Sequence, residues 1–199
     1  MFLLFFFLGA FFLGAIPNAY LAGRFLKNID IRQHGSGNVG ATNVFRVLGK
    51  GPGIVVFCLD FLKGYLPVAI FLIFFLTNPH RELTALLIGL TAVLGHMFTP
   101  FLGFKGGKGI ATGAGVLCAS FPKLFAITLA VWVISFLVFR IVSLSSMLSV
   151  CALFLSGILI QQPREILFVF AGMVVLVFWG HRKNMQKLKE GTEHRWINR

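Results

Sequence analysis

Residues 103–122 read Gly-Phe-Lys-Gly-Gly-Lys-Gly-Ile-Ala-Thr-Gly-Ala-Gly-Val-Leu-Cys-Ala-Ser-Phe-Pro, a glycine- and lysine-rich loop that runs directly into an uncharged segment. Glycine has no Cβ, so successive backbone N–H groups can approach an anion closely, and a helix N-terminus beside them favours negative charge. A plain turn between two helices, with its lysines marking one membrane face, explains the same residues equally well. A nucleotide-binding Walker A loop is excluded, because the spacing is one residue short and Gly109 stands where Ser or Thr is required.

The composition is that of a protein embedded in a membrane. Of the residues 57% are hydrophobic, 24 are Phe and only 12% are charged, and the mean hydropathy is +0.88. We therefore expect an all-α integral membrane protein with a single transmembrane domain over residues 1–199. The net charge of +12 then reports topology rather than nucleic-acid binding. The cysteines at 58, 118 and 151 lie in apolar runs without metal-ligand spacing, so we expect neither a metal site nor a cofactor.

Seven apolar runs predict seven transmembrane helices, some short or kinked. They cover residues 1–23, 53–76, 83–104, 109–122, 124–139, 141–163 and 166–180. Pro17 and Asn18 should kink the first run. Asp60 and Lys63, three residues apart inside the second, should form an ion pair, because an unpaired charge in a membrane is costly.

The distribution of lysine and arginine decides whether the short run 109–122 crosses the membrane, since a full span needs about 20 residues. If it crosses, only Arg81, Lys123 and Arg164 of the 18 lysines and arginines lie on one side; if it does not, the two sides are nearly balanced. Positive charge collects on the cytoplasmic side. The sequence therefore predicts that the run crosses, that the N-terminus lies outside and that the C-terminus is cytoplasmic.

With this topology four polar stretches face the cytoplasm, at residues 28–50, 103–109, 140–146 and 181–195. In the first, we expect a short helix over residues 39–48, capped by Asn38, with Thr42, Asn43 and Arg46 on one face. His96 precedes the glycine loop and is either a buried structural group or part of a site. Together the stretches offer cations, hydroxyls and amides suited to phosphate: Ser36, Asn43, Arg46, Lys105, Lys108, Ser143, His181 and Asn184. The adjoining Phe- and Leu-rich runs suit an acyl chain.

These stretches resemble the motifs of a known family. Residues 35–46, 95–109, and 181–184 with 191–193 are similar in order and spacing to the three motifs of the bacterial acyl-phosphate-dependent glycerol-3-phosphate acyltransferases, the PlsY family. The similarity extends over the whole chain and includes Asp60, Lys63, Arg140 and Ser143.

The resemblance implies an enzyme that transfers a fatty acyl group from acyl-phosphate to the 1-hydroxyl of sn-glycerol 3-phosphate. The products are lysophosphatidic acid and inorganic phosphate, in the first step of phospholipid synthesis. The reaction would take place at the cytoplasmic face of the bacterial inner (cytoplasmic) membrane. Its partners would be acyl-phosphate, glycerol 3-phosphate and membrane lipid, with the enzyme that makes acyl-phosphate as a further candidate.

We assign each site residue a role that fits this chemistry. Residues expected to orient reacting groups or stabilise developing charge, and so to be catalytic, are Ser36, Asn43, Arg46, His96 and Ser143. Residues expected to bind substrate are Gly37, Thr42, Lys105, Gly106, Gly107, Lys108, His181 and Asn184. A His-x-x-x-x-Asp acyltransferase dyad is absent from the sequence, and an activated acyl donor needs no strong general base if the substrates are well positioned.

Two other classes use the same residue types. An anion channel or transporter with a phosphate-binding vestibule would more often show internal repeats, and the sequence has no clear repeat. A membrane acyltransferase that uses acyl-CoA or acyl carrier protein differs only in its donor, and the residues alone do not distinguish it.

Overall fold

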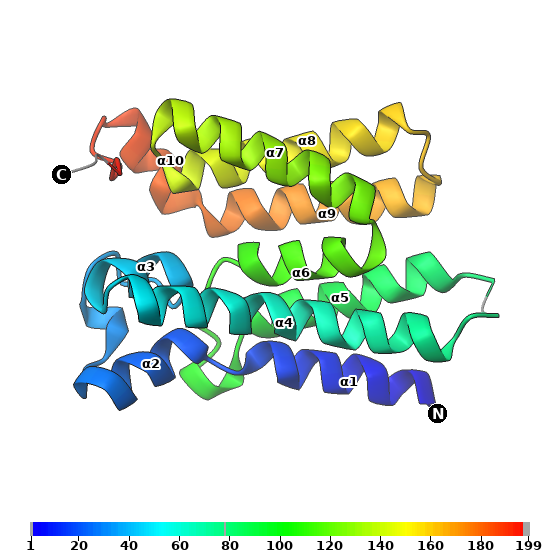
Figure 1. The fold of residues 1–199 in the computed structure, drawn as a ribbon, viewed down its shortest axis with the longest axis horizontal. Coiled ribbons are helices and arrows are strands. Elements are labelled where there is room, and N and C mark those ends of the chain that lie inside the picture. Colours follow the sequence, from blue (N-terminus) through cyan, green and yellow to red (C-terminus); the bar gives the residue numbers. More distant parts are fainter. Residues whose placement is uncertain (1, 78, 197–199) are drawn as a thin grey trace. The chain divides into compact units, whose positions relative to one another are not determined.

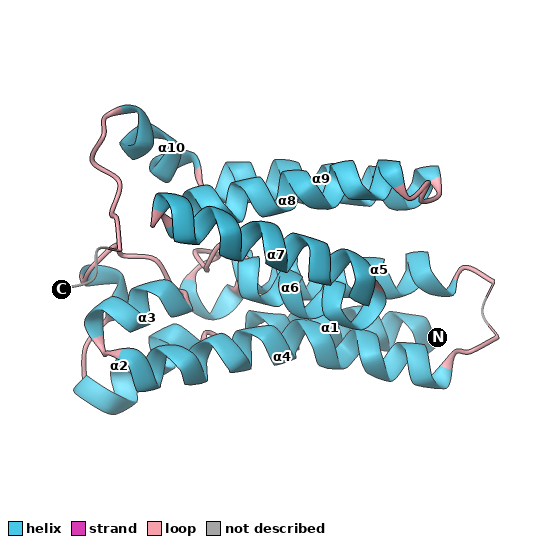
Figure 2. Ribbon diagram, turned by 45° about the horizontal axis from the view of Figure 1, so that its top comes forward, coloured by secondary structure: helices cyan, strands magenta, loops and turns pink. Residues whose placement is uncertain are grey.

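A computed structural model describes residues 2–77 and 79–196, and these are helical, with no strand among them (Figure 2). The chain divides into two compact units, residues 1–120 and 121–199, and each is described by itself. The all-α fold class is confirmed.

The first unit contains six α-helices and two short 3-10 helices. They are α1 (Phe2–Ala15), α2 (Asn18–Lys27), η1 (Ile31–Gln33), α3 (Ala41–Val47), α4 (Lys50–Phe74), α5 (Arg81–Met97), η2 (Pro100–Leu102) and α6 (Ile110–Ser120). Within this unit α1 packs on α5, and α4 packs on α6 (Figure 1). The break between α1 and α2 falls at residues 16–17, as Pro17 and Asn18 predicted, because proline has no N–H to continue the helical hydrogen bonds.

The second unit contains α7 (Pro122–Phe139), α8 (Val142–Leu159), α9 (Arg164–Gly180) and α10 (Arg182–Lys189). Helix α8 packs against both α7 and α9. The basic helix α10 turns away from α9 (Figure 2). The angle between them is 60°, and their junction is His181.

Among the residues that the structure describes, five helical segments are long and apolar enough to cross a membrane, or six if the bent α9–α10 pair is one span. Helix α6, with 11 residues, is about 16 Å long at 1.5 Å per residue. It is shorter than a full span, so the count of seven is not confirmed and stays a prediction. Large apolar side chains on the outer faces are exposed, including Phe5 at 65% and Phe168 at 78%, as expected where lipid is the solvent.

The short helix after the first polar loop differs from expectation. It begins at Ala41, and Gly40, not Asn38, occupies the N-cap position without a side-chain hydrogen bond. The predicted Asn38 cap is therefore wrong. Gly49, with φ of 96°, separates this helix from α4, which agrees with the predicted end of the helix at residue 48.

Glycines allow the helix pairs of the first unit to approach at backbone distance. A Cβ on Gly14 would overlap the Ala92 carbonyl, and a Cβ on Gly95 would overlap the Phe11 carbonyl, so α1 and α5 meet reciprocally. Helices α4 and α6 meet in the same way, through Gly64 at Thr112 and Gly115 at Phe61. Small residues are a common means of packing helices in lipid, where no water is released on association.

Replacing Gly64 with alanine should therefore destabilise the first unit. The added methyl would overlap the Thr112 carbonyl, and overpacking of this kind costs about 1–3 kcal/mol. Gly9→Ala is the matched control, because Gly9 lies within α1 and a Cβ there would meet nothing within 4 Å. Thermal unfolding of purified protein in detergent measures both; a Gly64→Ala midpoint equal to that of Gly9→Ala would show that the α4–α6 contact can relax.

Candidate active site

A buried polar cluster ties α4 to the break between α1 and α2. The Lys63 Nζ atom lies 2.9 Å from Asp60 Oδ1 and donates to the Ile16 carbonyl at 3.0 Å. Asn18 Nδ2 also donates to Asp60 Oδ1, at 3.0 Å. Asp60 and Lys63 are 2% and 4% exposed, so the predicted ion pair is confirmed, and the additional hydrogen bonds are what a buried pair needs to offset its desolvation.

The other carbonyl at the break also has a side-chain donor. Thr99 Oγ1 donates to the Ala15 carbonyl at 2.6 Å, and Thr99 is buried between α5 and η2. The sequence analysis gave neither Asn18 nor Thr99 a role as a hydrogen-bond donor at this break. The signal available for Asn18 was its place directly after Pro17, where a helix in lipid has backbone groups to satisfy.

His96 lies in the last turn of α5, between this cluster and the glycine loop. Its Nδ1 atom is 3.8 Å from Asp60 Oδ1, a distance too long for a hydrogen bond. The residue is 7% exposed.

The glycine loop lies against the C-terminal end of α5. The N–H groups of Gly106 and Gly107 donate to the carbonyls of Met97 at 3.0 Å and His96 at 3.1 Å. A Cβ on Gly106 would overlap the His96 carbonyl; one on Gly107 would overlap His96 Nε2 and lie 2.6 Å from the Val39 carbonyl oxygen. The fold itself uses these two N–H groups, and the assignment of Gly106 and Gly107 to substrate binding stays a prediction. Lys105 is exposed and Lys108 is half-buried, and their assignment to phosphate stays a prediction.

Asn43 organises the polar loop that precedes α3. Its side chain is fully buried. The Oδ1 atom accepts from the Ser36 N–H at 2.8 Å, and Nδ2 donates to the carbonyls of Ile31 at 3.1 Å and His34 at 3.0 Å. Asn43 was expected to orient reacting groups. In the structure its amide holds the loop that exposes Ser36, and its role in catalysis stays a prediction.

The remaining predicted residues of the first unit lie on or beside this loop. Gly37 has φ of 71° in the turn, and Thr42 and Arg46 are half-buried on α3. A cluster of small and branched apolar side chains fixes α2, the loop, α3, α4 and η2 to one another: Ala19, Val39, Val44, Val56 and Leu102. Because Gly107 approaches Val39, the structure brings the loop and the glycine loop together as predicted.

An ion pair at the start of the same loop adds local rigidity. Arg32 donates to Asp30 through its backbone N–H at 3.0 Å and through Nη2 at 2.6 Å. The hydrogen bonds from Arg32 lower the pKa of Asp30 to about 2. Since the folded pKa lies below the ordinary value, the pair stabilises the loop above about pH 4 and loses this effect as the pH falls towards 2.

In the second unit, Glu193 gathers two of the predicted site residues. Ser143 Oγ and Asn184 Nδ2 both donate to Glu193 Oε1 at 2.7 Å, and Ser143 is buried. The backbone N–H of Trp196 donates to the Arg140 carbonyl at 2.8 Å, so the C-terminal tail lies beside the start of α8. Glu193 was quoted as part of a motif but given no role; a carboxylate in a chain with only six acids was the available signal.

His181 is buried at the junction of α9 and α10, where its Nδ1 lies 2.8 Å from the Val177 carbonyl. A carbonyl can only accept, so Nδ1 is the donor in this contact. The substrate-binding roles of His181 and Asn184 stay predictions.

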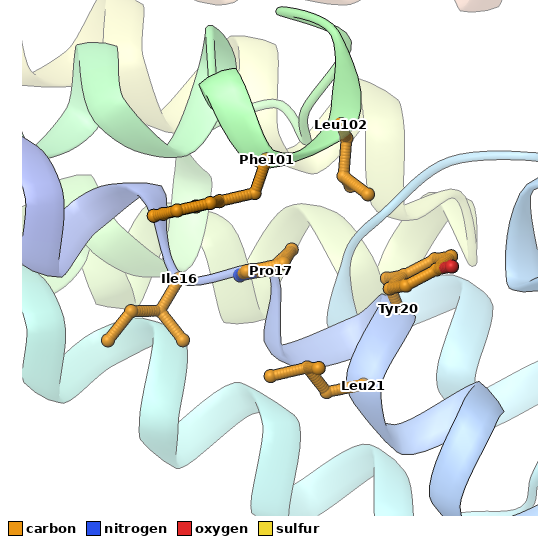
Figure 3. Close-up of a pocket in the computed structure, with 6 residues that line it drawn as sticks. All are labelled: Ile16, Pro17, Tyr20, Leu21, Phe101 and Leu102. Carbon is orange, nitrogen blue, oxygen red and sulfur yellow. The ribbon is translucent and has the colours of Figure 1, made fainter.

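An apolar pocket of about 340 Å³ lies where α1 breaks. Its walls are Ile16, Pro17, Tyr20, Leu21, Phe101 and Leu102 (Figure 3). The last two belong to η2, which leads directly into the glycine loop. Among the described residues no group of three His, Cys, Asp or Glu is arranged to hold a metal ion.

The sequence is similar to those of known membrane acyltransferases. A family model described as glycerol-3-phosphate acyltransferase matches residues 4–191. The chain is 42% identical over 193 residues to the glycerol-3-phosphate acyltransferase of Desulfotalea psychrophila, covering 94% of each chain. It is 42% identical over 187 residues to that of Aquifex aeolicus, covering 94% of this chain and 95% of the relative.

Two solved structures have the same fold. The crystal structure of PlsY (YgiH), an integral membrane glycerol 3-phosphate acyltransferase, in its glycerol 3-phosphate form superposes with a TM-score of 0.92 at 40% identity, covering 99% of this chain and 96% of that one. Its lysophosphatidic acid form gives a TM-score of 0.89 over the same shares. Fold and polar residues thus define an integral membrane acyltransferase. The chain belongs to the glycerol-3-phosphate acyltransferase family, which confirms the resemblance seen in its motifs.

Asn43 provides a test that separates holding the loop from chemistry. Asn43→Ala removes one acceptor and two donors and leaves the Ser36 N–H and two carbonyls without this partner, which should lower stability by roughly 2–4 kcal/mol. Asn38→Ala, a half-buried amide of the same loop, is the control. Thermal unfolding and limited proteolysis within residues 30–40 are the measurements; an Asn43→Ala protein that has normal stability but no turnover would assign this residue to catalysis instead.

Proposed function

We propose that this enzyme transfers a fatty acyl group from acyl-phosphate to the 1-hydroxyl of sn-glycerol 3-phosphate, giving lysophosphatidic acid and inorganic phosphate. The family and the glycerol 3-phosphate and lysophosphatidic acid forms of the related structure support the acceptor and the product. The choice of acyl-phosphate rests on the resemblance of the motifs to the acyl-phosphate-dependent enzymes and on the form of the pocket.

The observation that carries the proposal is the adjacency of the apolar pocket and the glycine loop. Phe101 and Leu102 line the pocket, and the loop with Lys105 and Lys108 begins at the next residue. An apolar slot followed directly by a cationic loop matches an amphiphile with an apolar tail and a small anionic head. Acyl-phosphate has this form. In the other two donors the acyl chain is attached to a much larger group, CoA or acyl carrier protein.

The reaction needs little beyond positioning and charge stabilisation. The 1-hydroxyl oxygen attacks the acyl carbonyl carbon, the bond from that carbon to the phosphate oxygen breaks, and phosphate leaves with the electron pair. The hydroxyl proton passes to a substrate phosphate oxygen. Lysine and arginine offset the repulsion between two phosphates, and fixed donors stabilise the charge that develops on the carbonyl oxygen. We assign Lys105 and Lys108 to phosphate, Arg46 to glycerol 3-phosphate and Ser36 to orienting the reacting groups.

Turnover of purified protein with each donor tests this proposal. Acyl-phosphate should support acyl transfer to glycerol 3-phosphate without CoA, nucleotide or added metal, with one inorganic phosphate released per acyl group transferred. Transfer from acyl-CoA or acyl carrier protein, with none from acyl-phosphate, would refute it.

A pair of lysine variants is the matched control for this assay. Lys105→Met should lower kcat/KM with acyl-phosphate by roughly 10²-fold if its charge meets a substrate phosphate. Lys50→Met removes an equally exposed charge at the start of α4 and should change little. Equal effects of the two substitutions would show that general surface charge, not the loop, attracts the donor.

We also propose that the protein lies in the bacterial inner membrane with its N-terminus outside and its C-terminus in the cytoplasm. This orientation puts most lysines and arginines, and the glycine loop, on the cytoplasmic side. A reporter fused after the last residue should be active only in the cytoplasm. Periplasmic activity of that fusion would reverse the topology and place the site on the wrong side for a cytoplasmic substrate.

A further inference from the structure

The polar cluster buried in the first unit extends in one direction to the α1–α2 break and in the other to the glycine loop. We propose that Asp60 and His96 are positioning residues that hold the glycine loop against the end of α5. The inference rests on the proposed function in one respect, that this loop binds a substrate phosphate. In this proposal the cluster positions the glycine loop in addition to joining helices.

Asp60 is the centre of the cluster. Its Oδ1 atom is shared by Asn18 at 3.0 Å and Lys63 at 2.9 Å, and it lies 3.8 Å from His96 Nδ1. These partners come from α2, α4 and α5. An ion pair that served α4 alone would need only Asp60 and Lys63, which are already three residues apart on one face. The two further partners make the carboxylate a junction between three helices.

Hydrogen bonds to the α1–α2 break also hold this junction in place. Lys63 donates to the Ile16 carbonyl, and Thr99 donates to the Ala15 carbonyl. The two carbonyls of the break thus each have a side-chain donor, and the Ile16 carbonyl also accepts the Asn18 N–H at 3.1 Å; backbone groups without a partner are costly in a membrane. The carboxylate of Asp60 is therefore held in place from both directions along α4 and α2.

His96 transmits this position to the loop through both its side chain and its backbone. The ring has Nδ1 towards Asp60 and Nε2 packed against Gly107, where a Cβ would overlap it. The His96 carbonyl accepts the Gly107 N–H at 3.1 Å, and the next carbonyl accepts the Gly106 N–H. A change in ring position therefore displaces Gly107, and with it the flanking Lys105 and Lys108.

This packing argues against His96 as the proton acceptor in the reaction. The ring is buried. Its Nδ1 points towards the Asp60 carboxylate, and its Nε2 packs against Gly107, where there is no room for a methyl group. Gly107 does not have φ in the left-handed region, so its glycine identity is explained by space and not by backbone conformation. A side chain at 107 would therefore displace the His96 ring, the Val39 carbonyl or both.

The test compares His96→Ala, Asp60→Asn and Gly107→Ala in the purified full-length protein. Initial rates against acyl-phosphate and against glycerol 3-phosphate give kcat and KM separately, and hydrogen exchange of the Gly106 and Gly107 amides reports on the loop directly. Loss of positioning should raise KM for one of the phosphate substrates by roughly 10-fold or more, with a smaller fall in kcat. It should also speed exchange at both amides. Thr91→Val, whose hydroxyl bonds within α5 to the Ile88 carbonyl, is the control and should change neither.

A double variant keeps the test sharp if a single one folds poorly. His96→Ala removes the ring that the methyl of Gly107→Ala would overlap, so the double variant should have a lower KM than Gly107→Ala by roughly threefold or more, as expected for residues in contact. Rescue should be partial, since the Val39 carbonyl lies 2.6 Å from the same methyl position. If Asp60→Asn unfolds because Lys63 is left unpaired, Asp60→Asn with Lys63→Met removes both charges.

Three outcomes would overturn the inference. In the first, His96→Ala abolishes kcat while KM and loop exchange stay normal, which would place His96 at the reacting atoms. In the second, amide exchange at Gly106 and Gly107 is the same in His96→Ala and in wild type. In the third, the effects of His96→Ala and Gly107→Ala are additive. Failure of the proposed function looks different, because wild-type protein would then show no transfer from acyl-phosphate, while the exchange experiment would still decide whether His96 holds the loop.

Discussion

The ion pair between Asp60 and Lys63 is the interaction on which the first unit depends. Two opposite charges in an apolar helix are tolerated because each also meets a group that the membrane could not satisfy: Lys63 a carbonyl at the α1–α2 break, and Asp60 the amide of Asn18. Beyond the break, α2 shares a small apolar core with α3, α4 and η2. The polar loop and the glycine loop are both attached to that core.

The sequence predicted what depends on local spacing. Long apolar runs indicated helices, Pro17 indicated the break, and a three-residue separation indicated the Asp60–Lys63 pair. The motif segments also resembled one family strongly enough to name it. Each of these follows from a few neighbouring residues or from a recurring order of motifs, so no knowledge of the packing was needed.

What the sequence did not predict depends on contacts between distant segments. The direction of an N–H group is set by backbone conformation and by whatever carbonyl lies nearby, so the use of Gly106 and Gly107 by α5 could not be inferred from a run of glycines. Asn43 looked like a functional amide because it shares a face with Arg46, but the carbonyls that occupy it lie 9 and 12 residues away. Glu193 is 50 residues from Ser143, and a contact of that range leaves no local pattern.

The shortness of α6 has a consequence for the depth of the glycine loop. A helix of 11 residues covers about half of a hydrocarbon core that is about 30 Å thick. None of its residues is exposed, and it packs on α4 and α5, so the membrane need not adjust to its length. If α6 crosses, the non-helical backbone at its ends lies below the lipid head groups, which is tolerated where that backbone is buried in protein or lines a water-filled cavity. An amphiphilic donor dissolved in one leaflet could reach the lysines by lateral diffusion, without first leaving the membrane for water.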